Sequence, residues 1–237
     1  MNKPTTEYFD CGDARIAYKQ NGSGPDLLLL HGNSASKEEF TKYQQEYFKD
    51  FRTLAIDSRG HGETKSADTA YSFDQYSEDV LALCAGKGIT SAYIIGYSDG
   101  GNLSLHLAKK APQLFKKIAA ISPNYLAEGL NDKFLSGIQI AEKIFSFLQR
   151  AGFSTKRMVM RIQLMTNDIG LTEADLQSIT TDIKILHAEK DLIKEEHIQK
   201  MAGLIPHCDL QKIMNSNHLS IPYKTETIEA IRQYFID

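Results

Sequence analysis

Short runs of apolar residues alternate along most of the chain with longer segments in which apolar residues recur every three or four positions. The short runs predict strands and the periodic segments predict helices. We expect strands at residues 7–10, 14–20, 27–30, 53–56, 92–95, 117–121, 183–187 and 210–214. We expect helices at residues 38–49, 72–86, 102–110, 195–204 and 226–235. This alternation predicts an α/β fold with a mostly parallel central sheet and helices on both faces.

Residues 125–180 interrupt the alternation and are too long for a structureless loop in a compact domain. Apolar residues at helical spacing predict one helix over residues 134–148, a second over 158–165 and a third over 172–179. We interpret this insertion as a helical cap on a core formed by residues 1–124 and 181–237. Most of its Phe and Met side chains are expected to pack against one another, and a minority to line an apolar pocket.

Composition narrows the class of protein. A chain of 237 residues with this alternation is commonly a single domain, and 27 basic against 30 acidic residues give a net charge of −3. Basic residues do not interleave with aromatic ones, so we expect no nucleic-acid partner. The three scattered cysteines, Cys11, Cys84 and Cys208, fit reduced thiols. No stretch resembles a signal peptide or a membrane span, so we expect a cytoplasmic protein without a membrane partner. The oligomeric state stays open.

The stretch Gly96-Tyr97-Ser98-Asp99-Gly100-Gly101 joins an apolar strand to a helix. A serine on a sharp strand-to-helix turn needs small residues two positions before and after it, because side chains there would collide with the backbone. Such a turn exposes the Ser98 hydroxyl at the carboxyl end of the sheet. The spacing therefore predicts a nucleophile, although a G-x-S-x-G pattern also occurs by chance in ordinary turns.

Active sites of open α/β sheets lie at the carboxyl ends of the strands. Asp191 follows the strand at 183–187 and His218 follows the strand at 210–214, so serine, acid and histidine occupy three strand exits in that order. Glu189 competes with Asp191 for the role of the acid, and its place two residues earlier favours Asp191. The exit Ser122-Pro123-Asn124 offers no carboxylate.

His218 is the histidine best placed to act as a base, because it lies in a polar turn directly after a strand. His197 lies within a predicted helix and His207 precedes a strand, which favours solvated or structural roles. His31 and His61 are expected to stabilise their turns. Asn217 precedes His218, and an asparagine there can tolerate a positive φ.

Five motifs in this order resemble the α/β-hydrolase family: His31-Gly32, Asp57-Ser58-Arg59-Gly60-His61-Gly62, the serine turn, Asp191 and His218. The likeness covers nearly the whole chain. The resemblance implies the α/β-hydrolase fold and an oxyanion hole made by the backbone N–H groups of Asn33 and Asp99. It implies no metal and no organic cofactor.

Two roles are open for the Asp99 side chain. Its carboxylate could stabilise the positive end of the helix dipole. This is the simpler interpretation, because acidic residues are generally favourable at helix N-termini. Alternatively, it could face the pocket and bind a substrate ammonium group, since Ser-Asp-Gly-Gly resembles the version in members that cleave amino-acid esters.

The sequence therefore predicts a serine hydrolase for a small-molecule carboxylic ester or thioester, with Ser98 as nucleophile, His218 as base and Asp191 as the acid that orients it. Three alternatives remain: a carbon–carbon bond hydrolase with the same triad, an acyltransferase or lyase, and a non-enzymatic receptor that retains the triad. The identity of the substrate depends mostly on the cap.

Overall fold

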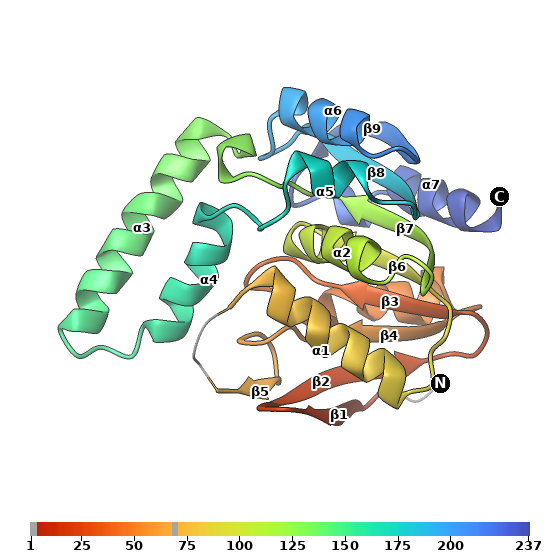
Figure 1. The fold of residues 1–237 in the computed structure, drawn as a ribbon, viewed down its shortest axis with the longest axis horizontal. Helices are drawn as coiled ribbons and strands as arrows, with labels where there is room; N and C mark the ends of the chain where they lie inside the picture. Colours follow the sequence, from red (N-terminus) through yellow and green to blue (C-terminus); the bar gives the residue numbers. More distant parts are fainter. Residues whose placement is uncertain (1–3, 68–70) are drawn as a thin grey trace.

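The chain folds around one twisted sheet, seen in a computed structural model that describes residues 4–67 and 71–237. Within these residues the sheet has nine strands in the order β1-β2-β4-β3-β6-β7-β8-β9, and the short β5 also pairs with β2 (Figure 1). The strands are β1 (Thr6–Cys11), β2 (Ala14–Asn21), β3 (Asp26–Leu30), β4 (Arg52–Ile56), β5 (Lys65–Ser66), β6 (Ala92–Tyr97), β7 (Phe115–Ile121), β8 (Asp182–Lys190) and β9 (Cys208–Asn217). Pairings of β2 are antiparallel, and all pairings from β4 to β9 are parallel. The predicted fold class is confirmed.

Seven α-helices lie between or after the strands in this part of the chain. They are α1 (Phe73–Gly86), α2 (Asp99–Lys110), α3 (Asp132–Arg150), α4 (Lys156–Thr166), α5 (Glu173–Gln177), α6 (Glu195–Leu204) and α7 (Thr225–Ile236). Side-chain caps mark the first residues of α1 and α5. Ser72 accepts a hydrogen bond from the N–H of Gln75 before α1, and Thr172 with Asp175 forms a complete capping box before α5. None of these helices is both long and apolar enough to cross a bilayer.

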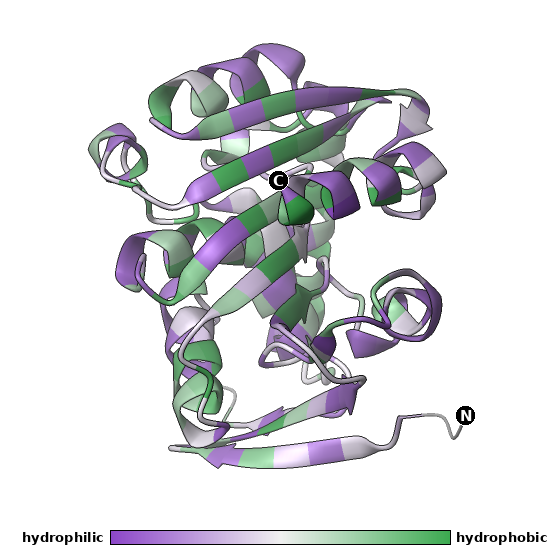
Figure 2. Cartoon of the chain, turned by 90° about the vertical axis from the view of Figure 1, so that its right-hand side faces the viewer, coloured by the Kyte–Doolittle hydropathy of each residue, from purple (hydrophilic) through white to green (hydrophobic). Residues whose placement is uncertain are grey.

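The two faces of the sheet have separate hydrophobic cores, because successive strand residues point to opposite faces. In β3, Leu28 and Leu30 pack with α1, α2 and α6, whereas Leu27 and Leu29 pack with α7 and the aromatic segment after β3. All four leucines are at most 1% exposed. Figure 2 shows hydrophobic strands in the middle of the sheet and a mixed pattern in β1 at its edge. The central strands are therefore buried on both faces.

Residues 38–49, predicted as one helix, form a continuous helical stretch over residues 37–47 that changes type along its length. A 3₁₀-helix spans Lys37–Phe40 and a π-helix spans Tyr43–Tyr47, where the N–H of Phe48 donates to the carbonyl of Tyr43. The wider turn stacks the rings of Tyr43 and Phe48 at 5.5 Å and lets Phe40 pack edge-on against Tyr43. All three rings are buried, so this rare π turn is accompanied by close aromatic packing. Two other 3₁₀ turns occur at Ala127–Gly129 and Ile221–Tyr223.

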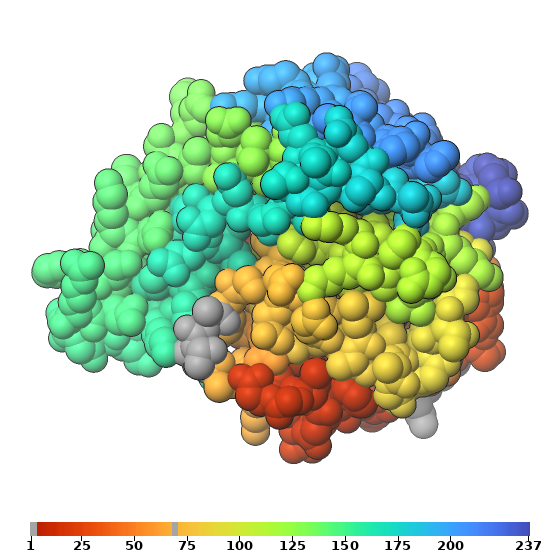
Figure 3. Space-filling model, viewed as in Figure 1, coloured from red at the N-terminus to blue at the C-terminus, as the bar shows by residue number. Residues whose placement is uncertain are grey.

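Helices α3 and α4 pack against each other and project beyond the sheet, as Figures 1 and 3 show. No residue of α3 is buried. The short α5 instead packs near α2 and α6, over the core. Three helices thus occupy the predicted insertion, and the division of the chain at residues 125 and 180 stays a prediction.

Candidate active site

The turn between β6 and α2 holds Ser98 in a strained backbone conformation. Its φ is 53° and its ψ is −116°, and α2 begins at the next residue rather than at residue 102. A Cβ on Gly96 would collide with the carbonyl of Gly100, and a Cβ on Gly100 would collide with the carbonyl of Leu30 in β3. Both glycines are therefore required for the close approach of helix and strands. Strain of this kind costs roughly 1–3 kcal/mol and is typical of functional turns.

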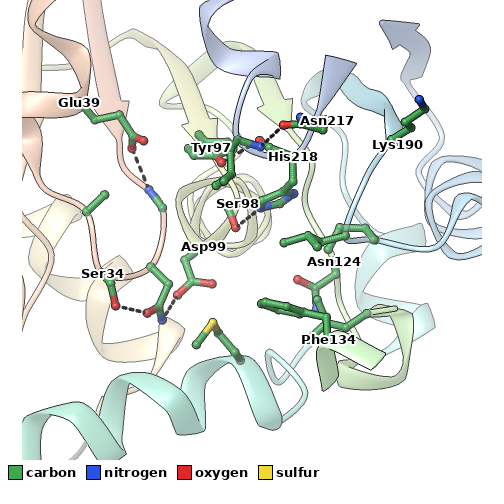
Figure 4. Close-up of a pocket in the computed structure, with 18 residues that line it drawn as sticks. Ser34, Glu39, Tyr97, Ser98, Asp99, Asn124, Phe134, Lys190, Asn217 and His218 are labelled. Carbon is green, nitrogen blue, oxygen red and sulfur yellow. Dashed lines mark hydrogen bonds between the residues drawn. The ribbon is translucent and has the colours of Figure 1, made fainter. Parts of the chain in front are cut away.

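Three side chains from the ends of β6, β8 and β9 form a continuous chain of hydrogen bonds. Ser98 Oγ lies 3.1 Å from Nε2 of His218 (Figure 4). Nδ1 of His218 lies 2.6 Å from Oδ1 of Asp191. Because Asp191 can only accept when ionised, Nδ1 carries the proton and Nε2 is free to accept the proton of Ser98. The structure thus brings together the three residues singled out from the strand exits.

The Asp191 carboxyl is 2% exposed and fully engaged. Its Oδ2 accepts hydrogen bonds from the Ser122 hydroxyl at 2.5 Å and the backbone N–H of Ala188 at 2.9 Å. Burial raises the pKa of Asp191, but the contacts with His218, Ser122 and Ala188 outweigh it and hold the pKa below its usual value. The group is therefore an anion at neutral pH and can orient His218 and stabilise its protonated form.

His218 is also fixed through its backbone. Its carbonyl accepts a hydrogen bond of 2.8 Å from the hydroxyl of Tyr97, the residue before Ser98. The Asn217 side chain closes the turn by accepting from the N–H groups of Leu219 and Ser220. The positive φ expected at Asn217 occurs at Asn215 instead, at 51°. Asn217 thus shapes the turn through its side-chain amide rather than through an unusual backbone.

The remaining candidates for acid or base have other partners. Glu189 accepts from the N–H of Asn215 at 2.7 Å. His197 stacks on the ring of Tyr125 and accepts its backbone N–H, and His207 is exposed. His31 Nε2 accepts from the N–H of Ser58, and His61 Nδ1 donates to the carbonyl of Arg59, so both histidines hold their own loops.

The loop after β3 brings Asn33 beside the start of α2. The side-chain amide of Asn33 donates to Asp99 Oδ2 at 2.8 Å and to the backbone carbonyl of Arg161 in α4 at 2.9 Å. The backbone N–H of Asp99 is the first of α2 and so has no acceptor within the helix. Asn33 therefore connects the loop, the serine turn and α4, while the oxyanion hole at the two N–H groups stays a prediction.

The Asp99 side chain faces the cavity in Figure 4 while standing in the first turn of α2. Burial raises the pKa of Asp99 to about 6, and the hydrogen bond from Asn33 acts in the opposite direction. A second acid, Glu39, lines the same cavity and accepts from the N–H of Gly32 at 3.2 Å. Burial also raises the pKa of Glu39.

The cavity above Ser98 has a volume of about 630 Å³. Its apolar lining comes from both the core and the predicted cap: Leu130, Phe134, Met165, Leu192 and Ile193. Lys190, which is exposed, stands at its rim. In the part of the chain that the structure describes, no cluster of three or more His, Cys, Asp or Glu residues is arranged to hold a metal ion. The site is a mainly apolar pocket that carries a few polar groups, as small-molecule sites commonly do.

Three contributors were missed from the sequence. Glu39 falls inside the segment predicted as a helix, and Tyr97 is simply the last residue of an apolar strand. Ser122 occupies a strand exit that lacks a carboxylate, although a hydroxyl there can support an acid on the neighbouring strand. The position of Ser122 at an exit was the one available signal.

A sequence profile of the alpha/beta hydrolase fold matches residues 25–159. The 2-(acetamidomethylene)succinate hydrolase of Mesorhizobium japonicum is 30% identical over 112 residues, or 47% of this chain and 40% of that protein. The dihydrolipoyllysine-residue acetyltransferase component of the acetoin cleaving system of Pseudomonas putida is 33% identical over 140 residues, or 58% of this chain and 38% of that protein. The matches thus span less than half the length of these curated relatives.

A solved structure of E-2-(acetamidomethylene)succinate hydrolase is similar to this chain along its whole length. It gives a TM-score of 0.82 and covers 99% of this chain and 100% of that chain. The two sequences are 19% identical, so this likeness concerns the fold alone.

Proposed function

Because this chain belongs to the α/β-hydrolase fold family, we propose that it is a serine hydrolase that cleaves a small carboxylic ester or thioester through an acyl-enzyme. The two consecutive hydrogen bonds from Ser98 through His218 to Asp191 carry the proposal. A serine hydroxyl is too weak a nucleophile without a base in contact, and this geometry supplies one.

In the proposed reaction Ser98 Oγ attacks the carbonyl carbon while Nε2 of His218 takes its proton. Asp191 stabilises the imidazolium that forms. The negative charge on the carbonyl oxygen faces the backbone N–H groups of Asn33 and Asp99. The leaving alcohol or thiol departs with the proton from His218, and the ester bond to Ser98 replaces the bond that breaks. Water, activated in turn by His218, then releases the acid.

The charges of the cavity favour certain substrates over others. Asp99 and Glu39 place two carboxyl groups in an otherwise apolar pocket, so acidic substrates are disfavoured. We propose that ionised Asp99 binds a substrate ammonium group, which is the second of the two roles considered above for its side chain. Since the pKa of Asp99 is about 6, this preference should weaken as the pH falls below that value.

Labelling with a fluorophosphonate probe and turnover of a graded panel of p-nitrophenyl esters and thioesters test the reaction class. Ser98→Ala should abolish labelling and lower kcat by several orders of magnitude (roughly 10⁶ for loss of the nucleophile in one protease). Ser154→Ala, at an exposed serine in the turn between α3 and α4, is the matched control and should label normally. Undiminished labelling of Ser98→Ala would rule out Ser98 as the nucleophile.

The ammonium preference needs its own substrates. An alanyl ester should be hydrolysed faster than its N-acetylated form by the native chain, and Asp99→Asn should remove the difference. Equal rates for the two esters in the native chain would eliminate this role while leaving the serine mechanism intact.

Acyl transfer is the second candidate, because one matched relative is an acetyltransferase component. Transfer and hydrolysis share the acyl-enzyme and differ in what attacks it. Product analysis with competing alcohols or thiols separates them: transfer predicts the acylated acceptor as the main product, whereas hydrolysis predicts the free acid. Hydrolysis of a carbon–carbon bond substrate would instead give the free acid and a protonated carbon fragment in place of an alcohol or thiol.

A further inference from the structure

The outward face of α3 carries large apolar side chains that nothing in the described chain covers. Ile140, Ile144 and Phe147 recur at helical spacing and are 58%, 53% and 68% exposed. Phe153, in the turn that leads to α4, is 62% exposed. Isolated exposed apolar residues are ordinary, but an aligned row of them marks a contact surface.

Basic side chains flank this row and acidic ones are missing from it. We call the surface formed by Lys143, Ile144, Phe147, Arg150, Phe153 and Lys156 the cap ridge; all six residues are exposed. No acidic residue occurs between Lys143 and Asn167, in a chain whose net charge is −3. The nearest acid on α3, Glu142, borders Lys143 and Phe147, and its carboxylate accepts hydrogen bonds from Gln163 and Thr166 of α4.

The basic residues of the cap ridge are available for an external partner. Lys143, Arg150 and Lys156 form no ion pair with any residue in the ranges 4–67 and 71–237. Helix α3 also forms the outer edge of the molecule, opposite the sheet (Figures 1 and 3). A flat surface can therefore approach it without meeting the core.

We propose that the cap ridge docks on a lipid bilayer that contains anionic headgroups. Lys and Arg beside Phe and Ile on an exposed helix are the composition that binds at such an interface, where rings enter the headgroup region and cations meet the phosphates. A second copy of the chain fits less well, because self-association would bring identical basic side chains together.

Docking of this kind is peripheral and needs no spanning segment. It departs from the sequence-based expectation of no membrane partner, because that expectation considers only spanning segments. It also stands apart from the serine mechanism, since it uses no residue of the catalytic site. Its test is therefore a binding measurement in which ester hydrolysis plays no part.

Flotation of the full-length chain with phosphatidylcholine vesicles, made with and without phosphatidylglycerol, tests the proposal. The native chain should float with the anionic vesicles, and added salt should release it. Lys143→Glu with Arg150→Glu should weaken binding by more than about tenfold, because each basic residue near an anionic surface contributes about fivefold. Phe147→Ser with Phe153→Ser should weaken it comparably.

Two matched controls change exposed residues elsewhere. Lys42→Glu with Lys49→Glu repeats the charge reversal near the π turn, and Ile236→Ser removes an apolar side chain that is 72% exposed at the end of α7. Both should bind like the native chain, and circular dichroism should show all variants folded. Failure to float, equal binding by all variants, or a dimer in sedimentation analysis that the cap-ridge substitutions dissociate would each overturn the proposal.

Discussion

The central sheet and the α3–α4 pair differ sharply in how they are held. Every residue of β3 from Leu27 to Leu30 is at most 1% exposed, whereas no residue of α3 is buried. The sheet is stabilised by burial on both faces. The helix pair is stabilised by its mutual packing, by apolar contacts of Leu164 and the first turns of α3 with the core, and by a few polar contacts. The three residues of the proposed triad all come from strand ends. Chemistry should therefore depend on the sheet, and access to the cavity on the helix pair.

The largest expected contrast is between Asp191 and Phe134, which lie on either side of this divide. Asp191→Asn should lower kcat by about 10⁴, because an amide there favours the wrong tautomer of His218, as in serine proteases. Phe134→Ala removes only part of the cavity lining and should mainly raise KM. Steady-state kinetics on one ester measures both. A loss of kcat in Phe134→Ala as large as that in Asp191→Asn would contradict this division of roles.

Stability should follow the same divide. Leu28→Ala leaves a cavity in the packed core and should lower the free energy of unfolding by about 2–5 kcal/mol. Ile144→Ala, at a residue that is 53% exposed, should change it by about 0.5 kcal/mol or less. Urea unfolding of the two variants provides the comparison. Similar losses in both would mean that α3 is stabilised by more than its visible contacts.

Arg161 provides a polar link between the two regions. Its guanidinium donates through Nε to the carbonyl of Gly60 at 2.8 Å, and its own carbonyl accepts from Asn33. Arg161→Met should weaken the attachment of α4 by about 1.5–3 kcal/mol and speed proteolytic cleavage in the turn at residues 151–155. Arg150→Met, at an exposed arginine, is the control and should leave the cleavage rate unchanged.

The smallest expected effect concerns the pH dependence of stability at Asp99. The native state raises the pKa of this group from 3.8 to about 6, so between these values it holds a proton that the unfolded chain has lost. Stability from this group is therefore present at low pH and is lost as the pH rises through about 6. Asp99→Asn should raise the melting temperature at pH 7 to 8, with the gain vanishing below about pH 4. A gain that is the same at every pH would contradict the shifted pKa.

The parallel sheet could be predicted from the sequence because its strands are continuous apolar runs separated by periodic helices. Ser98, Asp191 and His218 could be singled out because parallel strands of such a sheet all end at one edge. Their distances in the structure follow from that topology. The sequence was thus sufficient to predict where each of these residues lies relative to the end of its strand.

The parts that could not be predicted depend on contacts between distant side chains. The π turn at residues 43–47 lies against distant parts of the chain, through the ring contact of Phe48 with Phe235 and the hydrogen bond from the Tyr43 hydroxyl to the carbonyl of Pro222. The Asn33 amide bridges to Asp99, 66 positions away, and to Arg161, 128 positions away. Glu39 lines the cavity from the 3₁₀ turn at residues 37–40 and accepts a hydrogen bond from Gly32, seven positions before it.

The α3–α4 pair leaves the core and returns to it at almost the same point. The N–H of Ile169, just after α4, donates to the carbonyl of Tyr125, which precedes α3, at 3.2 Å. Strands β7 and β8 pair with each other directly. The segment between Tyr125 and Ile169 therefore does not set the register of their pairing. Hairpins of other lengths could consequently be exchanged at this closed junction, and the scaffold could acquire a new specificity by recombination without refolding its catalytic half.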